Sequence, residues 1–246
     1  MINIVGDTHT HTIACGHAMG TLTENAIYAK KHGLRFVAIT EHSGNLPAAP
    51  IFWFFPNMLW HVPRVVEDVV VLRGAEVNIV NVNGEVDFPE DLMKSLDIII
   101  ASVHFSEVFE HGAYGVEDYT NMYCKVAENP LVDVIGHCGD PRFEYDFERI
   151  IQAFKKYDKI VEINAASPKS RKGGEEKDRE IVRLCKRYGV KVTLASDAHA
   201  PQSVGMVQNC IKLLEEEDFP EELIVNANYE RFRQEMFRRR GYLLPE

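Results

Sequence analysis

The segment INIVGDTHTHTIACGH (residues 2–17) begins as a short apolar run and ends among three histidines. Its first part, Ile2–Asp7, predicts a buried β-strand, because it is rich in β-branched and other apolar residues. His9 and His11 follow directly and are two residues apart, and side chains two apart on an extended chain point to the same side. We therefore expect both imidazoles to reach one cation, with His17 six residues further on.

The alternation of a short strand with a helical segment repeats along the rest of the chain. Further strands are predicted at Phe36–Thr40, within Val69–Val77 and at Asp97–Ala101, Val132–Gly136, Ile160–Ile163 and Val190–Ala195. Helices are predicted at Thr21–Gly33, which opens with a capping-box pattern, and near 117–128, 147–157, 175–188, 203–217 and 229–240. Asn83-Gly84 lies between alternating apolar residues of Ile79–Phe88 and predicts a hairpin there.

Apolar strands that alternate with helices indicate an α/β protein with a parallel sheet buried on both faces. About seven such units in 246 residues fit a closed, TIM-like β/α barrel, and a doubly wound open sheet is the alternative. No linker or low-complexity run interrupts the chain, so residues 1–246 are expected to form a single domain. No glycine-rich nucleotide loop follows any predicted strand.

Charge and cysteine content restrict the possible partners. Lys and Arg number 27 and Asp and Glu 37, a net charge of −10, which disfavours sequence-independent binding to nucleic acid or anionic membrane. Bound metals can still attract a small phosphorylated substrate. The five cysteines are scattered, no signal peptide is evident, and the longest apolar stretch, Ile51–Trp60, is about half a membrane span. A cytoplasmic protein without membrane association is expected.

Six of the seven predicted strands end at a histidine, glutamate or aspartate. Successive strand ends are separated by 33, 34, 28 and 33 residues, and then by 60, which is two units. One β/α unit per interval places all these groups on the same face, where barrels hold their active sites. The candidate metal ligands are His9, His11, His17, His42, Glu76, His104, His137, Asp197 and His199.

Seven histidines and two carboxylates suit Zn²⁺, and Mn²⁺ or Fe²⁺ are possible substitutes. One ion would use only three or four of them, so two or three ions are implied, with a carboxylate as the natural bridge. A single histidine at a strand end is more often a structural residue than a ligand. Here, however, seven of ten histidines fall in register with strand ends, and only His32, His61 and His111 fall in helix or loop segments.

The ordered set resembles the polymerase and histidinol phosphatase (PHP) family, in particular its YcdX-type branch of small bacterial phosphatases. The resemblance is carried by Asp-x-His-x-His from Asp7, Thr-Glu-His at His42, Gly-x-Glu at Glu76, Gly-His at His137 and Ser-Asp-x-His at His199. It covers nearly the whole chain, with support from segments 60–66, 81–87 and 170–173. It implies a distorted (β/α)₇ barrel, three metal ions, usually zinc, and phosphoesterase activity.

The resemblance also implies how the ligands are shared. His9, His11, Glu76 and Asp197 would hold one ion, Glu76, His104 and His137 a second, and His17, His42 and His199 the third. A hydroxide between two ions would attack phosphorus, so Glu76, Asp197 and His9 would be catalytic through metal-activated water. Cys138 departs from the family pattern, in which proline often follows the histidine, and is interpreted as a spectator whose side chain points away from that of His137.

Basic residues near the expected active face are candidate substrate contacts. Lys169, Arg171 and Lys172 follow the sixth strand, and Arg142 follows Asp140-Pro141. Each could bind substrate phosphate, and a solvated loop is an equally weighted interpretation. Segment 51–60 could wall the pocket, form a lid or simply pack as a short helix.

The sequence therefore predicts a metal-dependent phosphatase that hydrolyses small phosphate monoesters. A phosphodiesterase or nuclease is the first alternative, although the acidic charge argues against long polynucleotides. An amidohydrolase-like barrel is the second, but no lysine lies at a strand end in register. A non-catalytic metal-binding module is the third. The natural substrate, the physiological metal and a possible homo-oligomer stay open.

Overall fold

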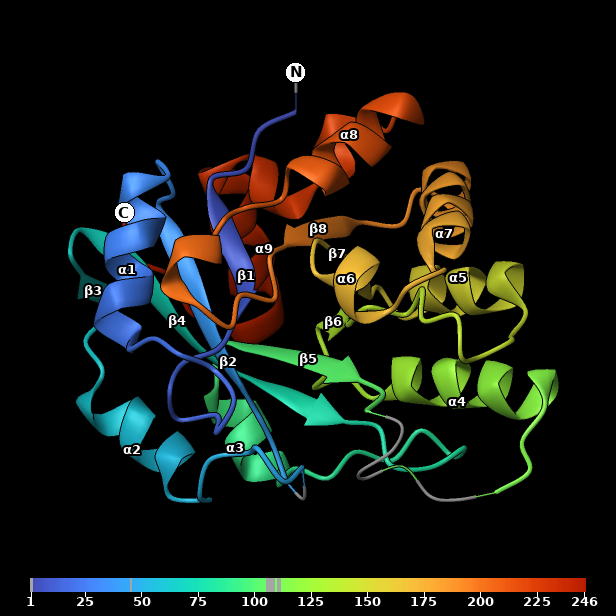
Figure 1. The fold of residues 1–246 in the computed structure, drawn as a ribbon, viewed down its shortest axis with the longest axis horizontal. Helices are drawn as coiled ribbons and strands as arrows, with labels where there is room; N and C mark the ends of the chain where they lie inside the picture. The colour runs from blue at the N-terminus through green and yellow to red at the C-terminus, as the bar shows by residue number, and fades with distance from the viewer. Residues whose placement is uncertain (1, 45, 105–108, 110–111) are drawn as a thin grey trace.

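The computed structural model describes the chain except for residues 1, 45, 105–108 and 110–111, so His111 lies outside the described residues. A parallel sheet forms its centre (Figure 1). Its parallel strands are β1 (Gly6–Thr10), β2 (Phe36–His42), β4 (Val69–Asn78), β5 (Ile98–Ser102), β6 (Val134–Ile135), β7 (Ile160–Asn164) and β8 (Val192–Ala195). A two-residue strand, β3 (Val65–Val66), pairs antiparallel with β4.

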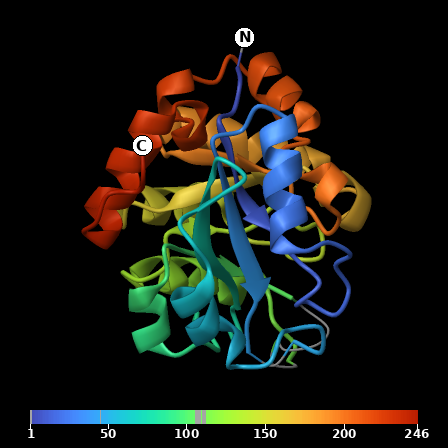
Figure 2. The same ribbon diagram turned by 90° about the vertical axis from the view of Figure 1, so that its left-hand side faces the viewer.

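The strands follow one another in the order β1-β2-β4-β5-β6-β7-β8, and each pairs in parallel with the next. The two edges of this sheet meet, because Thr10 forms a parallel bridge with Ala198. The amide of Asp197 also donates to the carbonyl of His9 at 3.0 Å. The result is a nearly closed, distorted (β/α)₇ barrel, as the sequence predicts, and not the open sheet (Figure 2).

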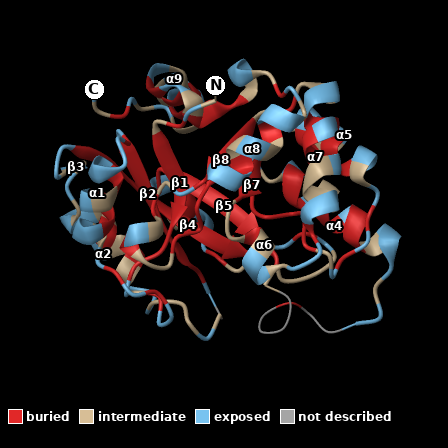
Figure 3. Ribbon diagram, turned by 45° about the horizontal axis from the view of Figure 1, so that its top comes forward, coloured by how far each residue is buried: buried red, intermediate tan, exposed pale blue. Residues whose placement is uncertain are grey.

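Helices cover the outside of the barrel, with exposed residues on their outward faces (Figure 3). In the described part of the chain they are α1 (Leu22–Lys31), α2 (Phe54–His61), α3 (Glu90–Ser95), α4 (Val116–Glu128), α5 (Phe147–Lys156), α6 (Ser167–Ser170), α7 (Glu175–Tyr188), α8 (Gln208–Glu216) and α9 (Tyr229–Arg240), with 3₁₀ turns at Pro201–Ser203, Glu221–Leu223 and Val225–Ala227. None of these helices is both long and apolar enough to cross a membrane.

The predicted capping box at the start of α1 is confirmed. The Thr21 side chain accepts the amide of Glu24, and a Glu24 carboxylate oxygen accepts the amide of Thr21 at 2.7 Å. Four unpaired amides begin every helix, and this exchange satisfies two of the donors at this end. Helices α7 and α9 span the predicted residues 175–188 and 229–240.

Several predicted elements differ from the structure in their bounds, and two of the differences have a clear cause. Strand β1 begins at Gly6 rather than Ile2, because the preceding Val5 donates its amide to the carbonyl of Asn226 instead of to a strand, and it extends to Thr10, which pairs with Ile39 of β2. The helix predicted at 203–217 begins only at Gln208, since Gly205 has a φ of +75° and donates its amide to Asp7. The hairpin predicted at 79–88 keeps its turn but only one antiparallel bridge.

Helix α9 closes the amino-terminal mouth of the barrel. Its Phe232 is fully buried and stacks on Phe36 of β2 with ring centroids 4.1 Å apart. Met236 and inward-facing residues of the strands, such as Leu72 and Ile100, complete this inner apolar cluster. Because apolar side chains fill this end, the polar residues of the strands gather at the opposite, carboxyl end.

Candidate metal centre

The carboxyl ends of the strands carry the nine residues that the sequence singled out. His9, His42 and Glu76 lie within β1, β2 and β4, and the register of β2 with β4 places His42 opposite Glu76. The others follow a strand end directly or stand on the loops beyond. The structure brings all nine into one cluster of contacts, described below: His9, His11, His17, His42, Glu76, His104, His137, Asp197 and His199.

Glu76 is the centre of this cluster. Its side chain is 1% exposed, and five imidazole nitrogens face its two oxygens. Oε2 lies 2.8 Å from Nδ1 of His42 and 3.3 Å from Nε2 of His9. Oε1 lies 3.0 Å from Nε2 of His137 and 3.4 Å from Nε2 of His104. Each oxygen of this carboxylate faces its own set of imidazole nitrogens, which is the geometry expected of a ligand that bridges two ions.

Asp197 faces a second group of nitrogens. Its Oδ1 lies 3.4 Å from Nε2 of His11 and 3.7 Å from Nε2 of His9, and His199 Nδ1 lies 3.5 Å away. Asp197 and His137 both adopt a positive φ, of 53° and 24°. Such backbone strain in non-glycine residues is rare and concentrates at functional sites.

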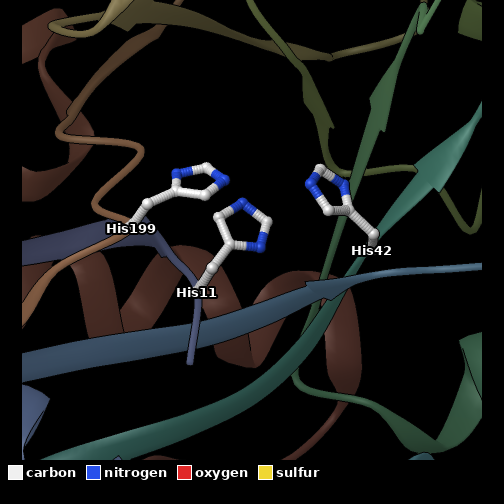
Figure 4. A group of neighbouring side chains, drawn as sticks. All are labelled: His11, His42 and His199. Atoms are coloured by element: carbon white, nitrogen blue, oxygen red, sulfur yellow. The ribbon is translucent and has the colours of Figure 1, made fainter. Parts of the chain in front are cut away.

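The histidines on the outer side of the cluster form a third group. His199 Nδ1 lies 2.9 Å from the carbonyl oxygen of Asp197, so it carries a proton and leaves Nε2 as an acceptor. That Nε2 lies 2.7 Å from Nε2 of His17. In Figure 4 the ring of His11 lies between those of the other two histidines, with its centroid 4.3 Å from that of His42 and 4.5 Å from that of His199. Ligand atoms from these three residues lie within 4.8 Å of one another, as do those of His9, His11 and Glu76.

The residues present fit a set of divalent cations. Glu76 Oε2 and His42 Nδ1 are buried and have no hydrogen-bond partner among the described residues, although they lie 2.8 Å apart. Buried polar atoms without a partner are costly, and cations bound in the cluster would satisfy both atoms. The two Nε2 atoms of His17 and His199 also face each other closely. Nitrogen and carboxylate donors together suit zinc, manganese or iron.

Acidic and basic side chains lie next to one another in the buried part of the cluster, and each shifts the pKa of its neighbours. Burial by itself would raise the pKa of Glu76, but His9, His104 and His42 hold it well below its usual value. Burial would lower the pKa of His9, but Glu162, Glu76 and Asp197 raise it well above its usual value. Protons on such histidines must leave when a metal binds, so metal affinity will fall in acid.

The ligands are supported by buried residues that sequence reasoning missed. Glu162 Oε1 lies 2.6 Å from Nδ1 of His9, and Asn78 Oδ1 lies 2.6 Å from Nδ1 of His104. The signal for Glu162 was present, because it is the single charged residue in the apolar strand 160–163. Nothing local in the sequence distinguishes Asn78.

Cys15 supports two further ligands. Its sulfur lies 3.7 Å from Nδ1 of His11 and accepts the amide of His42 at 3.3 Å. Burial raises the pKa of this thiol to about 11, so it stays protonated near neutral pH. Glu41 Oε2 lies 3.8 Å from Nδ1 of His11, and its other oxygen accepts the amide of Thr12.

The structure distinguishes among the basic side chains that the sequence offered as substrate contacts. Arg171 is mostly buried, and its Nη2 lies 3.7 Å from Oδ2 of Asp197, beside the cluster. Arg142 makes a two-pronged ion pair with Asp140, at 3.0 and 2.6 Å. Lys169 and Lys172 are exposed. Arg171 is therefore the basic side chain of this group best placed to meet a substrate at the cluster.

A cavity of about 400 Å³ opens above the cluster. Its walls are His17, His42, His104 and the apolar residues Leu46, Pro47 and Ala48. Segment 51–60 lies beyond this wall and forms most of α2, where Phe55 packs against Phe88. That geometry matches the short-helix interpretation of the segment. Cys138 is buried in the apolar layer between sheet and helices, as expected of a spectator.

Comparisons with known proteins find relatives that agree with one another. The model of the PHP domain family matches residues 7–166. A probable phosphatase of Caldanaerobacter subterraneus subsp. tengcongensis is 42% identical over 234 residues, which cover 95% of this chain and 91% of that protein. A probable phosphatase of Aliivibrio fischeri is 37% identical over 247 residues, covering 100% and 98%.

Among solved structures, the fold is similar to that of histidinol phosphate phosphatase from Lactococcus lactis, crystallised with zinc, L-histidinol and phosphate. The TM-score is 0.63 at 18% identity, and the alignment covers 87% of this chain and 94% of that one. At this identity the likeness shows a shared fold.

Proposed function

The chain belongs to the PHP domain family, and from this premise we propose that it is a metal-dependent phosphatase that hydrolyses small phosphate monoesters at a centre of three cations. The observation that carries the proposal is the cluster of seven histidines around the buried carboxylates of Glu76 and Asp197. Relatives that align over nearly the whole chain are named probable phosphatases, and the Lactococcus lactis protein was crystallised with zinc and phosphate.

The three cations would share the ligands through Glu76. One set is His9, His11, Glu76 and Asp197, the second is Glu76, His104 and His137, and the third is His17, His42 and His199. Divalent cations held there would supply Lewis acidity, which activates water at neutral pH and offsets the charge of phosphoryl oxygens. Zinc fits these donors, with manganese or iron as substitutes.

The side chains of this chain supply position and charge. Glu76, His9 and His42 stand within strands of the sheet, which holds their positions relative to one another. Arg171, beside Asp197, would donate to a phosphoryl oxygen and orient the ester. The cavity of about 400 Å³ and its apolar wall, Leu46–Ala48, favour a small leaving group over a polynucleotide.

The proposal is tested with two chromogenic esters and a metal analysis. Zinc-loaded protein should hydrolyse the monoester p-nitrophenyl phosphate much faster than the diester bis-p-nitrophenyl phosphate. Plasma emission should find about three metal ions per chain. A protein that carries this metal load and hydrolyses only the diester, or neither ester, would contradict the proposed function.

Arg171→Ala gives a sharper test of the substrate contact. Losing a hydrogen bond to a charged group costs about 1.5–3 kcal/mol, so kcat/KM for the monoester should fall roughly 10- to 150-fold. Arg142→Ala is the matched control, because its guanidinium is already paired with Asp140, and its kcat/KM should change less than about threefold. Equal losses in both variants would remove Arg171 from the substrate site.

A further inference from the structure

We propose that Glu162 is a positioning residue that orients two metal ligands, His9 and His137, at the same time. The inference rests on the proposed metal centre and deepens it. Glu162 lies on β7, the one parallel strand that contributes no candidate ligand. Its side chain is fully buried beneath the cluster.

The two oxygens of Glu162 serve different donors. Oε1 lies 2.6 Å from Nδ1 of His9. Oε2 accepts the backbone amide of His137 at 2.8 Å and the side-chain amide of Asn164 at 3.0 Å. One carboxylate thereby links three segments, namely β1, the residues that follow β6, and β7 itself.

The contact with His9 selects the form of the imidazole. An ionised carboxylate only accepts hydrogen bonds, so Nδ1 of His9 must carry the proton. The atom that loses its proton when a metal binds is then Nε2, which faces His11 Nε2 at 3.0 Å and Glu76 Oε2 at 3.3 Å. A carboxylate behind a ligating histidine fixes its tautomer and orientation and makes it a better donor to the metal.

The contact with His137 acts through the backbone. His137 has a φ of +24°, a strained value that the surrounding structure must enforce. The bond from its amide to Glu162 holds the peptide in this conformation. Its imidazole then lies with Nε2 3.0 Å from Glu76 Oε1.

The arrangement needs a carboxylate rather than an amide. A glutamine has one accepting oxygen and one donating nitrogen, so it can accept from His9 or from the amide of His137, but not from both. In Glu162→Gln one of the two ligands must therefore lose its support while the size of the side chain is kept.

A purely structural role for Glu162 is the competing explanation, and a matched residue separates the two. Asp133 is likewise buried, accepts the backbone amide of Ile99 at 2.8 Å and contacts the guanidinium of Arg240. It stands at the opposite end of the barrel, away from the cluster. Asp133→Asn therefore reproduces the loss of a buried carboxylate without touching a metal ligand.

The experiment measures zinc affinity by competition with a chromogenic chelator, and thermal unfolding of the metal-free proteins. Glu162→Gln should bind zinc about 10- to 100-fold more weakly than the unmodified protein. Asp133→Asn should lower the melting temperature but change zinc affinity less than threefold. Zinc affinity within threefold of the unmodified protein in Glu162→Gln would overturn the proposal.

A second measurement needs no variant at position 162. Long-range ¹H–¹⁵N NMR of histidine side chains in the zinc-loaded protein should show Nδ1 of His9 protonated, with the His9 signals assigned by their loss in His9→Gln. An unprotonated Nδ1 on His9 would overturn the proposal. Neither measurement uses turnover, so a protein that binds zinc in this way and hydrolyses no monoester would fail only the proposed function.

Discussion

The two ends of the barrel are built in opposite ways. At the carboxyl end, buried histidines and carboxylates face one another, and Glu76 Oε2 and His42 Nδ1 lack hydrogen-bond partners within the described residues. At the amino end, α9 covers the opening with Phe232 and Met236, and its charged residues meet opposite charges. At the amino end the buried charges are paired with protein groups, although Nε of Arg240 has no hydrogen-bond partner among the described residues, whereas at the carboxyl end cations would satisfy the unpartnered atoms.

The ion pairs of the amino end show how its buried charges are compensated by protein groups. Arg240 donates to the carbonyl oxygens of Met93 at 2.9 Å and Leu131 at 3.1 Å, and it contacts Asp133. Glu235 accepts from Lys191 at 2.7 Å. A buried charge is tolerated when it is paired and hydrogen-bonded, and both of these charges are paired, although Nε of Arg240 has no hydrogen-bond partner in the described part of the chain.

The residues that stabilise the fold and the residues of the metal centre therefore lie at opposite ends of the barrel. Changes at the carboxyl end should alter metal binding and turnover with little loss of stability in the metal-free protein. Changes at the amino end should alter stability and leave the metal centre intact. Four experiments test this separation of roles between the two ends.

Glu76→Ala should have the largest effect. Glu76 faces five imidazoles, so its loss removes the shared ligand, and kcat should fall at least about a thousandfold. Plasma emission should find fewer metal ions per chain. The metal-free variant should melt no more than a few degrees from the metal-free parent. An active variant, or one as destabilised as a core mutant, would break the comparison.

Phe232→Ala tests the closed end. Truncation of a fully buried aromatic side chain costs about 3–5 kcal/mol, and the stack on Phe36 is lost as well. The melting temperature should fall by roughly 10 °C in calorimetry. Zinc bound per folded chain should equal that of the parent, and a parallel loss of zinc would show that the two ends are coupled.

Removal of the metal ions should lower the stability of the protein only because their binding at the carboxyl end no longer stabilises the folded state. A site saturated at 100 times its dissociation constant adds about 2.7 kcal/mol to the free energy of unfolding. Chelation should therefore lower the melting temperature of the parent by several degrees. Glu76→Ala, with an impaired site, should show a much smaller shift. An equal shift in both proteins would mean that the cations bind elsewhere.

Glu235→Gln should have the smallest effect, and it depends on pH. Burial alone would raise the pKa of Glu235, but its contacts with Lys191, Arg239 and Arg238 lower it to about 2. Since the folded value lies below the unfolded value, the stabilisation is full above about pH 4.5 and is lost as the pH falls towards 2.

The variant should therefore unfold more easily than the parent by about 2 kcal/mol at pH 7, a figure reduced for partial exposure. The gap should close as the pH falls from 4.5 to 2. Denaturant unfolding across this range measures the gap, and zinc content at pH 7 serves as the control. A gap that stays constant with pH would show that the charge of Glu235 contributes nothing.

Local pattern in the amino-acid sequence was enough to predict the barrel and the candidate ligands. Each predicted strand carries its own apolar run, six of the seven end at a histidine or carboxylate, and parallel strands must end at the same edge of a sheet. The capping box of Thr21 and Glu24 is equally local, since its two members are three residues apart. Such features are visible without knowing which strands are neighbours.

Tertiary structure alone decided the contacts that join distant segments. Glu162 meets His9 across 153 residues, and Arg171 rather than Arg142 lies beside Asp197. Helix α9 closes the barrel by packing Phe232 on Phe36, almost 200 residues away. No periodicity encodes such pairs, because they depend on strand order, register and the packing of side chains that meet only when the barrel closes.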